Sequence, residues 1–195
     1  MKYKITGIIV CIAVLLVSFY APRITGESNT RYHQHIEAEE KAPCNHGEDV
    51  FCTHLPLVMI DTFGKEIPGK AVTNEQGETV YTTADDGSDE ITAQIKIADN
   101  PTENNHLDSD PALASDICIH VRGNSSRAFD KSGYAVRLIT AVGENNPQSV
   151  MGMDAHHEWA LHGPFIDKTL IRNYMWYNIA GEIMDYAPNV RFCEV

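Results

Sequence analysis

Alternating apolar and polar residues predict a sheet in the middle of the chain. From residue 91 to residue 97, Ile and Ala alternate with Thr92, Gln94 and Lys96, which is the period of a strand with one buried face. Further apolar or β-branched runs, separated by turn residues, predict strands at 55–60, 78–83, 117–121 and 134–139. The last two runs flank a short polar loop, so we expect them to pair as a β-hairpin.

A helical period replaces the strand period further along the chain. Between Lys168 and Met184, apolar residues recur at helical spacing, at Leu170, Ile171, Tyr174, Met175, Ile179 and Ile183. The carboxylate of Asp167 can accept hydrogen bonds from the first turn, and Pro188 closes the segment. Antiparallel strands with one long helix packed against them predict an α+β fold for residues 55–195.

The first 21 residues predict a membrane-targeting segment. Two lysines precede an almost unbroken apolar run over residues 5–21, which as a helix would extend about 25 Å. A cleaved signal peptide and an uncleaved signal anchor both fit, and the anchor is favoured because Leu16 and Phe19 stand where cleavage needs small residues. The lysines would keep the N-terminus inside, so we expect the rest of the chain outside the cytoplasm, with residues 22–54 as a polar stalk.

Composition narrows the classes of function. A chain of 195 residues has room for one domain and a leader, and an apolar fraction of 43% is enough for a buried core. With 27 acidic and 15 basic side chains, the formal charge of -12 disfavours binding to nucleic acid or to anionic membrane surfaces. Much of the acid falls at 85–90 and 99–110, and we interpret both stretches as solvated loops rather than calcium sites.

Outside the apolar run the cysteines are Cys44, Cys52, Cys118 and Cys193. Their even number suits an exported protein, in which Cys44 and Cys52 could close a short disulfide loop. Each of these two also belongs to a Cys-x-His unit, with His46 and His54 as the histidines, and together the units offer a tetrahedral zinc set. A disulfide, a zinc site and neither of them are the three open interpretations.

The loop between the two hairpin strands carries the strongest candidate chemistry. It reads Arg-Gly-Asn-Ser-Ser-Arg over residues 122–127 and is followed by Lys131, with Arg137 further along the second strand. A glycine and small polar residues can expose backbone N–H groups, and cations at both ends add positive charge, so the loop suits an anion such as phosphate. An ordinary β-turn with solvated arginines is the alternative.

Motifs after this loop follow a recognisable order. They are Met151-Gly152-Met153, then Trp159-Ala160-Leu161, then Asp167-Lys168-Thr169-Leu170-Ile171-Arg172-Asn173. In this order and at this spacing, residues 115–195 resemble the CotH kinase family, and residues 55–61 resemble its entry strand more loosely. Members of that family are spore coat or other extracytoplasmic proteins that look like atypical protein kinases dependent on ATP and Mg²⁺.

The resemblance implies a fold like the N-terminal lobe of an atypical kinase, with nucleotide bound at the loop. The residues it places at the nucleotide are Arg122, Gly123, Asn124, Ser125, Ser126, Lys131 and Arg137. The family often carries two lysines in a row where this chain has Lys131 followed by Ser132, so the identity of the phosphate-binding lysine stays open.

Structural roles are expected for three residues at the helix. Asp167 would cap its start, and Arg172 in the first turn opposes the helix dipole and therefore needs an acidic partner or an anionic ligand. Glu182 would pair with Lys131, by analogy with the strand-lysine and helix-glutamate pair of ordinary kinases.

The metal-binding and catalytic acids of the family lie beyond the last motif that this chain matches. We therefore expect the N-terminal part of an exported kinase, inactive as the isolated chain, with ATP and Mg²⁺ as cofactors and the magnesium ligands outside these residues. Its expected partners are a nucleotide, a protein substrate of the spore coat or cell surface, and the membrane through residues 1–21. The alternative is a non-catalytic cell-surface binding module on a CotH-type scaffold.

Overall fold

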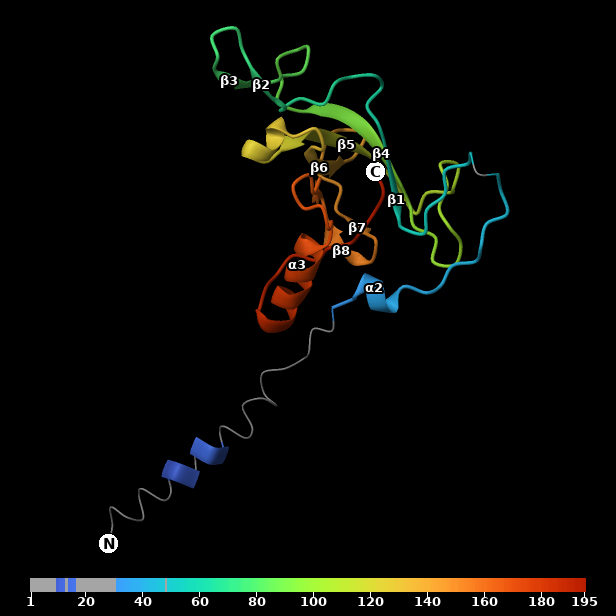
Figure 1. The fold of residues 1–195 in the computed structure, drawn as a ribbon, viewed down its shortest axis with the longest axis vertical. Coiled ribbons are helices and arrows are strands. Elements are labelled where there is room, and N and C mark those ends of the chain that lie inside the picture. Colours follow the sequence, from blue (N-terminus) through green and yellow to red (C-terminus); the bar gives the residue numbers. More distant parts are fainter. Residues whose placement is uncertain (1–9, 13, 17–30, 48) are drawn as a thin grey trace.

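A computed structural model describes residues 10–12, 14–16, 31–47 and 49–195. It contains a five-stranded antiparallel sheet with the strand order β1-β4-β5-β6-β9 (Figure 1). These strands are β1 (Leu57–Asp61), β4 (Ile91–Ala98), β5 (Leu113–Arg122), β6 (Gly133–Ile139) and β9 (Glu158–Leu161). The α+β class, the antiparallel sheet and the β5–β6 hairpin predicted from the sequence are confirmed.

Two small hairpins flank the central sheet. One pairs β2 (Ala71–Thr73) with β3 (Thr79–Tyr81), and the other pairs β7 (Gln148–Val150) with β8 (Met153–His156). In the orientation of Figure 1, β2–β3 lies above the sheet and β7–β8 below it, near α3. Val150 and Met153 of the second hairpin pack against the hydrophobic core, so this hairpin covers part of the apolar face of the sheet.

The core lies on one face of the sheet. Burial alternates along β4 as the sequence predicts, and the buried positions are Ile91, Ala93, Ile95 and Ile97. The neighbouring strand β5 adds Ile117 and Ile119, which are both 0% exposed. Because side chains alternate along a strand, His120 and Arg122 of β5 lie on the opposite, polar face.

The helix predicted over residues 168–184 is shorter and less buried than expected. α3 (Arg172–Ile183) cannot begin at Lys168, because Leu170 has a left-handed φ of 63° that a right-handed helix excludes. Within α3 only Tyr174 and Asn178 are buried, so the prediction of one long packed helix was wrong. Within residues 31–47 and 49–195, the other helical elements are the short α2 (Gln34–Glu37) and the 3-10 turn η1 (Ser125–Ala128).

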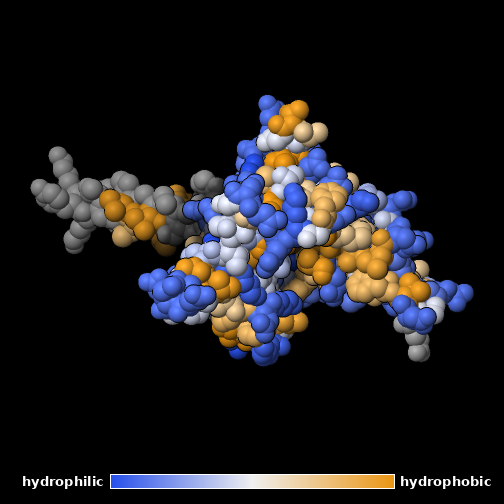
Figure 2. Space-filling view, turned by 90° about the horizontal axis from the view of Figure 1, so that it is seen from above, coloured by the Kyte–Doolittle hydropathy of each residue, from blue (hydrophilic) through white to orange (hydrophobic). Residues whose placement is uncertain are grey.

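Apolar side chains of α3 remain at the surface, among them Trp176 and Ile183 at 62% and 77% exposure. Apolar groups also lie between hydrophilic ones elsewhere on the described surface (Figure 2). Within the described ranges, no helix is long and apolar enough to cross a membrane. Most of the predicted anchor, residues 1–21, falls outside those ranges.

Residues 31–37, from the predicted stalk, contact the C-terminal residues. The side chain of Gln34 donates to the carbonyl of Phe192 at 3.0 Å and accepts from its N–H at 2.7 Å. Two residues further on, the backbone of Glu194 bonds to Pro56 and Val58, which adds it in parallel to the free edge of β1. These bonds join segments that are far apart in the sequence.

Candidate functional site

The loop that joins β5 to β6 has a tightly determined shape. Gly123 has a φ of +116°, and a Cβ at this position would collide with the hydroxyl of Ser126. The backbone then forms η1, and the guanidinium of Arg127 donates from Nε to the carbonyl of Gly123 at 2.8 Å. Arg127 also lies over the ring of Tyr81, 4.7 Å from its centroid. The glycine is therefore required by the conformation of the loop.

Lys70 adds a positive charge to this loop from a distant part of the chain. Its ammonium donates to the carbonyl of Phe129 at 2.7 Å and to the hydroxyl of Ser132 at 3.5 Å. Ser132 is the position at which the CotH resemblance would allow a second lysine. Sequence analysis missed Lys70, because a single lysine between a turn and a short strand shows no pattern.

Arg122 and Lys131 stand at the two ends of the loop, and both are exposed. Gly133 faces Arg122 across the hairpin, and Gly163, just after β9, packs on the backbone of Lys131 and Ser132. A Cβ on Gly163 would lie 2.9 Å from the carbonyl oxygen of Lys131, so only glycine fits there. Gly163 therefore allows the chain after β9 to pack closely against the backbone of Lys131 and Ser132.

Charged groups at this site shift the pKa of the His162 imidazole. Burial lowers its pKa, the positive charges of Arg122 and Lys131 lower it further, and Asp167 acts in the opposite direction. The charges of Arg122, Lys131 and Asp167, which lie well apart in the sequence, thus all act on this one imidazole. His162 was not among the residues predicted to bind.

Asp167 organises the turn that precedes α3. Its carboxylate accepts from the hydroxyl of Thr169 at 2.6 Å, from the N–H of Thr169 at 3.1 Å and from the N–H of Arg172 at 2.9 Å. The pKa of Asp167 is lowered, mainly by the Thr169 hydroxyl. Because Arg172 is the first residue of α3, the carboxylate does satisfy a helix N–H group, although Ile171 occupies the cap position. The guanidinium of Arg172 lies 3.6 Å from the same carboxylate.

Arg137 is engaged in an ion pair on the polar face of the sheet. Its guanidinium contacts the carboxylate of Glu90 at 2.5 Å, and both side chains are partly buried. Burial and Glu90 together raise the pKa of the neighbouring Cys118 thiol. Arg137 therefore already has a partner for its charge, which leaves Arg122 and Lys131 as the freer cations among the predicted residues.

A pocket of about 370 Å³ opens beside η1. Its walls include Tyr81, Thr82, Asp89, Glu90, His120 and Arg127. Since His120 and Arg122 are two residues apart on β5, the pocket and Arg122 lie on the same face of the sheet. The two carboxylates suit hydrogen-bond donors such as hydroxyl groups, whereas the cations of the loop suit an anion.

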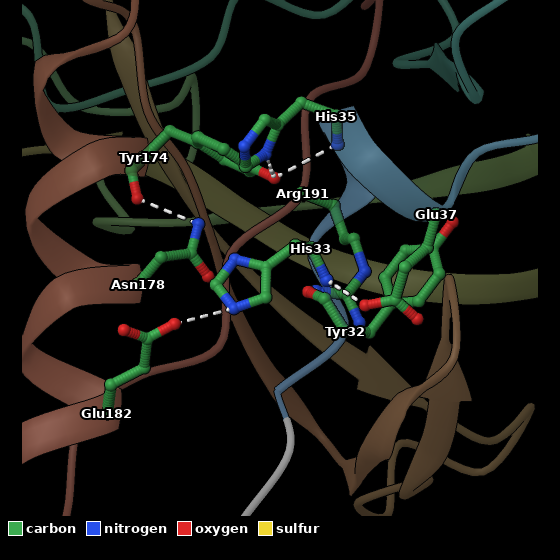
Figure 3. Close-up of polar contacts among 8 residues, drawn as sticks. All are labelled: Tyr32, His33, His35, Glu37, Tyr174, Asn178, Glu182 and Arg191. Atoms are coloured by element: carbon green, nitrogen blue, oxygen red, sulfur yellow. Dashed lines mark hydrogen bonds and ion pairs between the residues drawn. The ribbon is translucent and has the colours of Figure 1, made fainter.

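Glu182 and α3 take part in a second polar cluster, on the side of α2 (Figure 3). Glu182 contacts His33 at 2.8 Å, and the ion pair with Lys131 suggested by the kinase analogy is not formed in the described part of the chain. The hydroxyl of Tyr174 contacts His35 Nδ1 at 2.9 Å, while Arg191 stacks on Tyr32 with 4.5 Å between guanidinium carbon and ring centroid. This cluster connects residues 32–37 to the C-terminal part of the fold.

Comparison with known families places the C-terminal part of the chain. The family model described as CotH kinase protein matches residues 119–195. Over these residues, called the CotH segment below, the chain is similar to the CotH kinase family. No curated protein and no solved structure matches the chain.

The CotH segment contains all seven residues that the resemblance placed at a nucleotide, from Arg122 to Arg137, and also Asp167, Arg172 and Glu182. Lys70 and most of the pocket wall, by contrast, come from residues that precede the matched segment. Cys44 and Cys52 precede it as well, and they lie beside the β4–β5 loop rather than at the β5–β6 loop.

Proposed function

We propose that the CotH segment binds the phosphates of ATP at the β5–β6 loop, as the phosphate-binding part of an extracytoplasmic protein kinase. The observation that carries the proposal is the gathering of Lys70, Arg122, Arg127 and Lys131 around one loop in a chain with a formal charge of -12. The match to the CotH kinase family supports the choice of nucleotide over other anions. Export is supported by the lysine-led apolar run over residues 5–21.

Each cation has a distinct part in this proposal. Arg127 and Lys70 use hydrogen bonds to backbone carbonyls to hold the loop, so they set its shape and contribute charge at a fixed place. Arg122 and Lys131 are exposed and free to contact phosphate oxygens, which charge-assisted hydrogen bonds hold strongly. The hydroxyls of a ribose would find acceptors in the carboxylates of the neighbouring pocket.

Magnesium would neutralise part of the phosphate charge during transfer to a protein hydroxyl. The residues around the loop fit phosphate rather than the metal, because they offer cations and no converging set of free carboxylates. We therefore propose that the magnesium ligands and the catalytic acid belong to other parts of the kinase domain. The residues described here bind and orient the phosphates.

Removing either free cation should weaken nucleotide binding. Arg122→Ala and Lys131→Ala are each expected to lower the affinity for Mg-ATP by about 10- to 100-fold, since a hydrogen bond to a charged group contributes about 1.5–3 kcal/mol. Isothermal titration calorimetry on the full chain measures this effect.

The matched control is Lys96→Ala, which removes the same charge from an exposed position on β4. In the β4–β5 register Lys96 faces Ala114, at the far end of β5 from Arg122, so the control should leave the affinity within about twofold. Binding of Mg-ATP that both Arg122→Ala and Lys131→Ala leave intact would disprove the proposed site.

Bound phosphate should also raise the pKa of His162, because negative charge offsets the effect of Arg122 and Lys131. NMR titration of the imidazole is expected to give a value below 6.5 for the free protein and a higher value with Mg-ATP. In the free protein the unfolded chain binds the proton more readily, so the free energy of unfolding should fall as the pH drops through 6.5, and His162→Gln should reduce that fall. If saturating Mg-ATP leaves the pKa of His162 unchanged, the nucleotide binds elsewhere.

A non-catalytic binding module on the CotH scaffold is the second candidate. The observation in its favour is the exposure of apolar side chains on α3, including Trp176 and Ile183. Calorimetry separates the two candidates, because a module without nucleotide function would give no heat with Mg-ATP.

A further inference from the structure

A cluster of cysteine and histidine side chains that could bind a metal ion lies outside the β5–β6 loop. Cys44, His46 and Cys52 precede β1, and His106 belongs to the loop between β4 and β5. The ligand atoms of these four residues all lie within 4.8 Å of one another. The loop at 99–110, which the sequence suggested to be a solvated acidic stretch, therefore contributes to an organised site.

Two distances from the sulfur of Cys44 are close to those of a tetrahedral zinc site. Zinc bonds of about 2.3 Å to sulfur and ~2.0–2.1 Å to nitrogen separate two sulfurs by about 3.8 Å and a sulfur from a nitrogen by about 3.6 Å. Cys44 Sγ lies 3.5 Å from Cys52 Sγ and 3.5 Å from His106 Nε2. A disulfide would need the sulfurs at about 2.05 Å, and both cysteines are free thiols in the structure.

Neighbouring groups orient the ligands as they do at metal sites. Nδ1 of His46 lies 2.8 Å from the carbonyl of Gly47, which holds a proton on Nδ1 and leaves Nε2 free to bind a metal. The amide of Asn104 donates to Cys44 Sγ at 3.4 Å, and such a donor stabilises a thiolate. Three of the four ligand residues are partly buried, and His46 is exposed.

The backbone holds the two halves of the cluster together. Ala42 donates to the carbonyl of Thr102, and Thr53 and Asn105 exchange two backbone hydrogen bonds at 2.8 and 3.0 Å. These bridges lie on both sides of the cysteines in the sequence. The fully buried side chain of Asn105 adds a bond to the carbonyl of Leu55 at 2.8 Å, directly beside His106. The positions of the ligands thus do not depend on the metal alone.

We propose that Cys44, His46, Cys52 and His106 bind one structural zinc ion. Four protein ligands complete a tetrahedral shell and leave no open position for a substrate, so the ion would tie the segment before β1 to the β4–β5 loop. His54, the second histidine of the Cys-x-His pattern, is exposed and is not part of the cluster.

The test uses the full chain, purified under reducing conditions with zinc present. We expect about one zinc per chain by elemental analysis, and tetrahedral thiolate-cobalt absorption after exchange of zinc for cobalt. His106→Ala should lower zinc affinity by at least about 100-fold, beyond the range seen when only a ligand-orienting group is lost. His54→Ala, the matched control, should leave both the affinity and the cobalt spectrum unchanged.

Two results would overturn the proposal. One is a metal-free protein in which non-reducing peptide mapping finds Cys44 bonded to Cys52. The other is zinc binding that His54→Ala abolishes and His106→Ala does not. If His106→Ala fails to fold, His106→Cys supplies a thiolate instead, and it should retain zinc and shift the cobalt spectrum. Absence of metal from a folded His106→Cys variant would count against the site.

Discussion

Alanine in place of Gly163 is expected to destabilise the protein by about 1–3 kcal/mol and to weaken Mg-ATP binding, because the added methyl group has no room. Its carbon would lie 2.8 Å from the carbonyl carbon of Ser132 and 2.9 Å from the carbonyl oxygen of Lys131. Both are backbone atoms, so the loop must move, and Lys131 moves with it. Urea unfolding and calorimetry measure the two effects on one variant.

The control for this prediction is Gly47→Ala, the same chemical change at an open position. The nearest atom to the new methyl group there is the Asp49 carboxylate, at an ordinary 3.6 Å. We expect a change within about 0.5 kcal/mol for this surface substitution. Equal unfolding free energies for Gly163→Ala and the unaltered protein would show that the conformation of the loop does not depend on glycine at position 163.

Asn105→Ala is expected to lower the free energy of unfolding by about 2–4 kcal/mol, because each buried polar group that loses its partner costs about 1–3 kcal/mol. The side chain is 0% exposed. It donates to the carbonyl of Leu55 at 2.8 Å and accepts from the N–H of Asn100 at 3.0 Å. Urea unfolding measures the loss of stability. Faster hydrogen exchange at the Thr53 amide, which donates to the carbonyl of Asn105, would show that the loss is local to this bridge.

Asn145→Ala serves as the comparison, since Asn145 is exposed, and it should change the free energy of unfolding by no more than about 0.5 kcal/mol. Because the Asn105 amide bridges the two segments that carry the cysteines and His106, zinc should partly rescue Asn105→Ala if the metal site forms. A loss of stability no greater than that of the control would mean that solvent replaces the Asn105 bonds without cost.

Sequence patterns predicted those parts of the fold that depend on local periodicity. The alternation from Ile91 to Ile97 became β4, and the polar loop after Val121 became the turn of the β5–β6 hairpin. The helix was predicted too long, because its apolar spacing continues through Leu170, where the left-handed backbone ends any helix. Periodicity reports which residues share a face, and it cannot report a φ angle that tertiary packing imposes.

The same patterns could not predict contacts between residues that lie far apart in the sequence. Arg122 and Lys131 were recognised from one short motif, whereas Lys70 reaches the loop from 59 residues before Phe129. The same limit affected the cysteines: among the three open interpretations, the zinc set would have included His54, whereas the fold places His106 of the β4–β5 loop beside them. Only the tertiary fold determines which distant side chains meet.

The paired hydrogen bonds of Gln34 with Phe192 have a mechanical consequence. Arg31 also bonds to the carbonyls of Ala187 and Pro188, so residues 31–34 are joined to the segment that follows α3 before the chain reaches β1. A pull applied ahead of residue 31, as by a tether, would load these contacts before the central sheet. The force would then be carried by the C-terminal residues up to Glu194, which is bonded to the edge of β1.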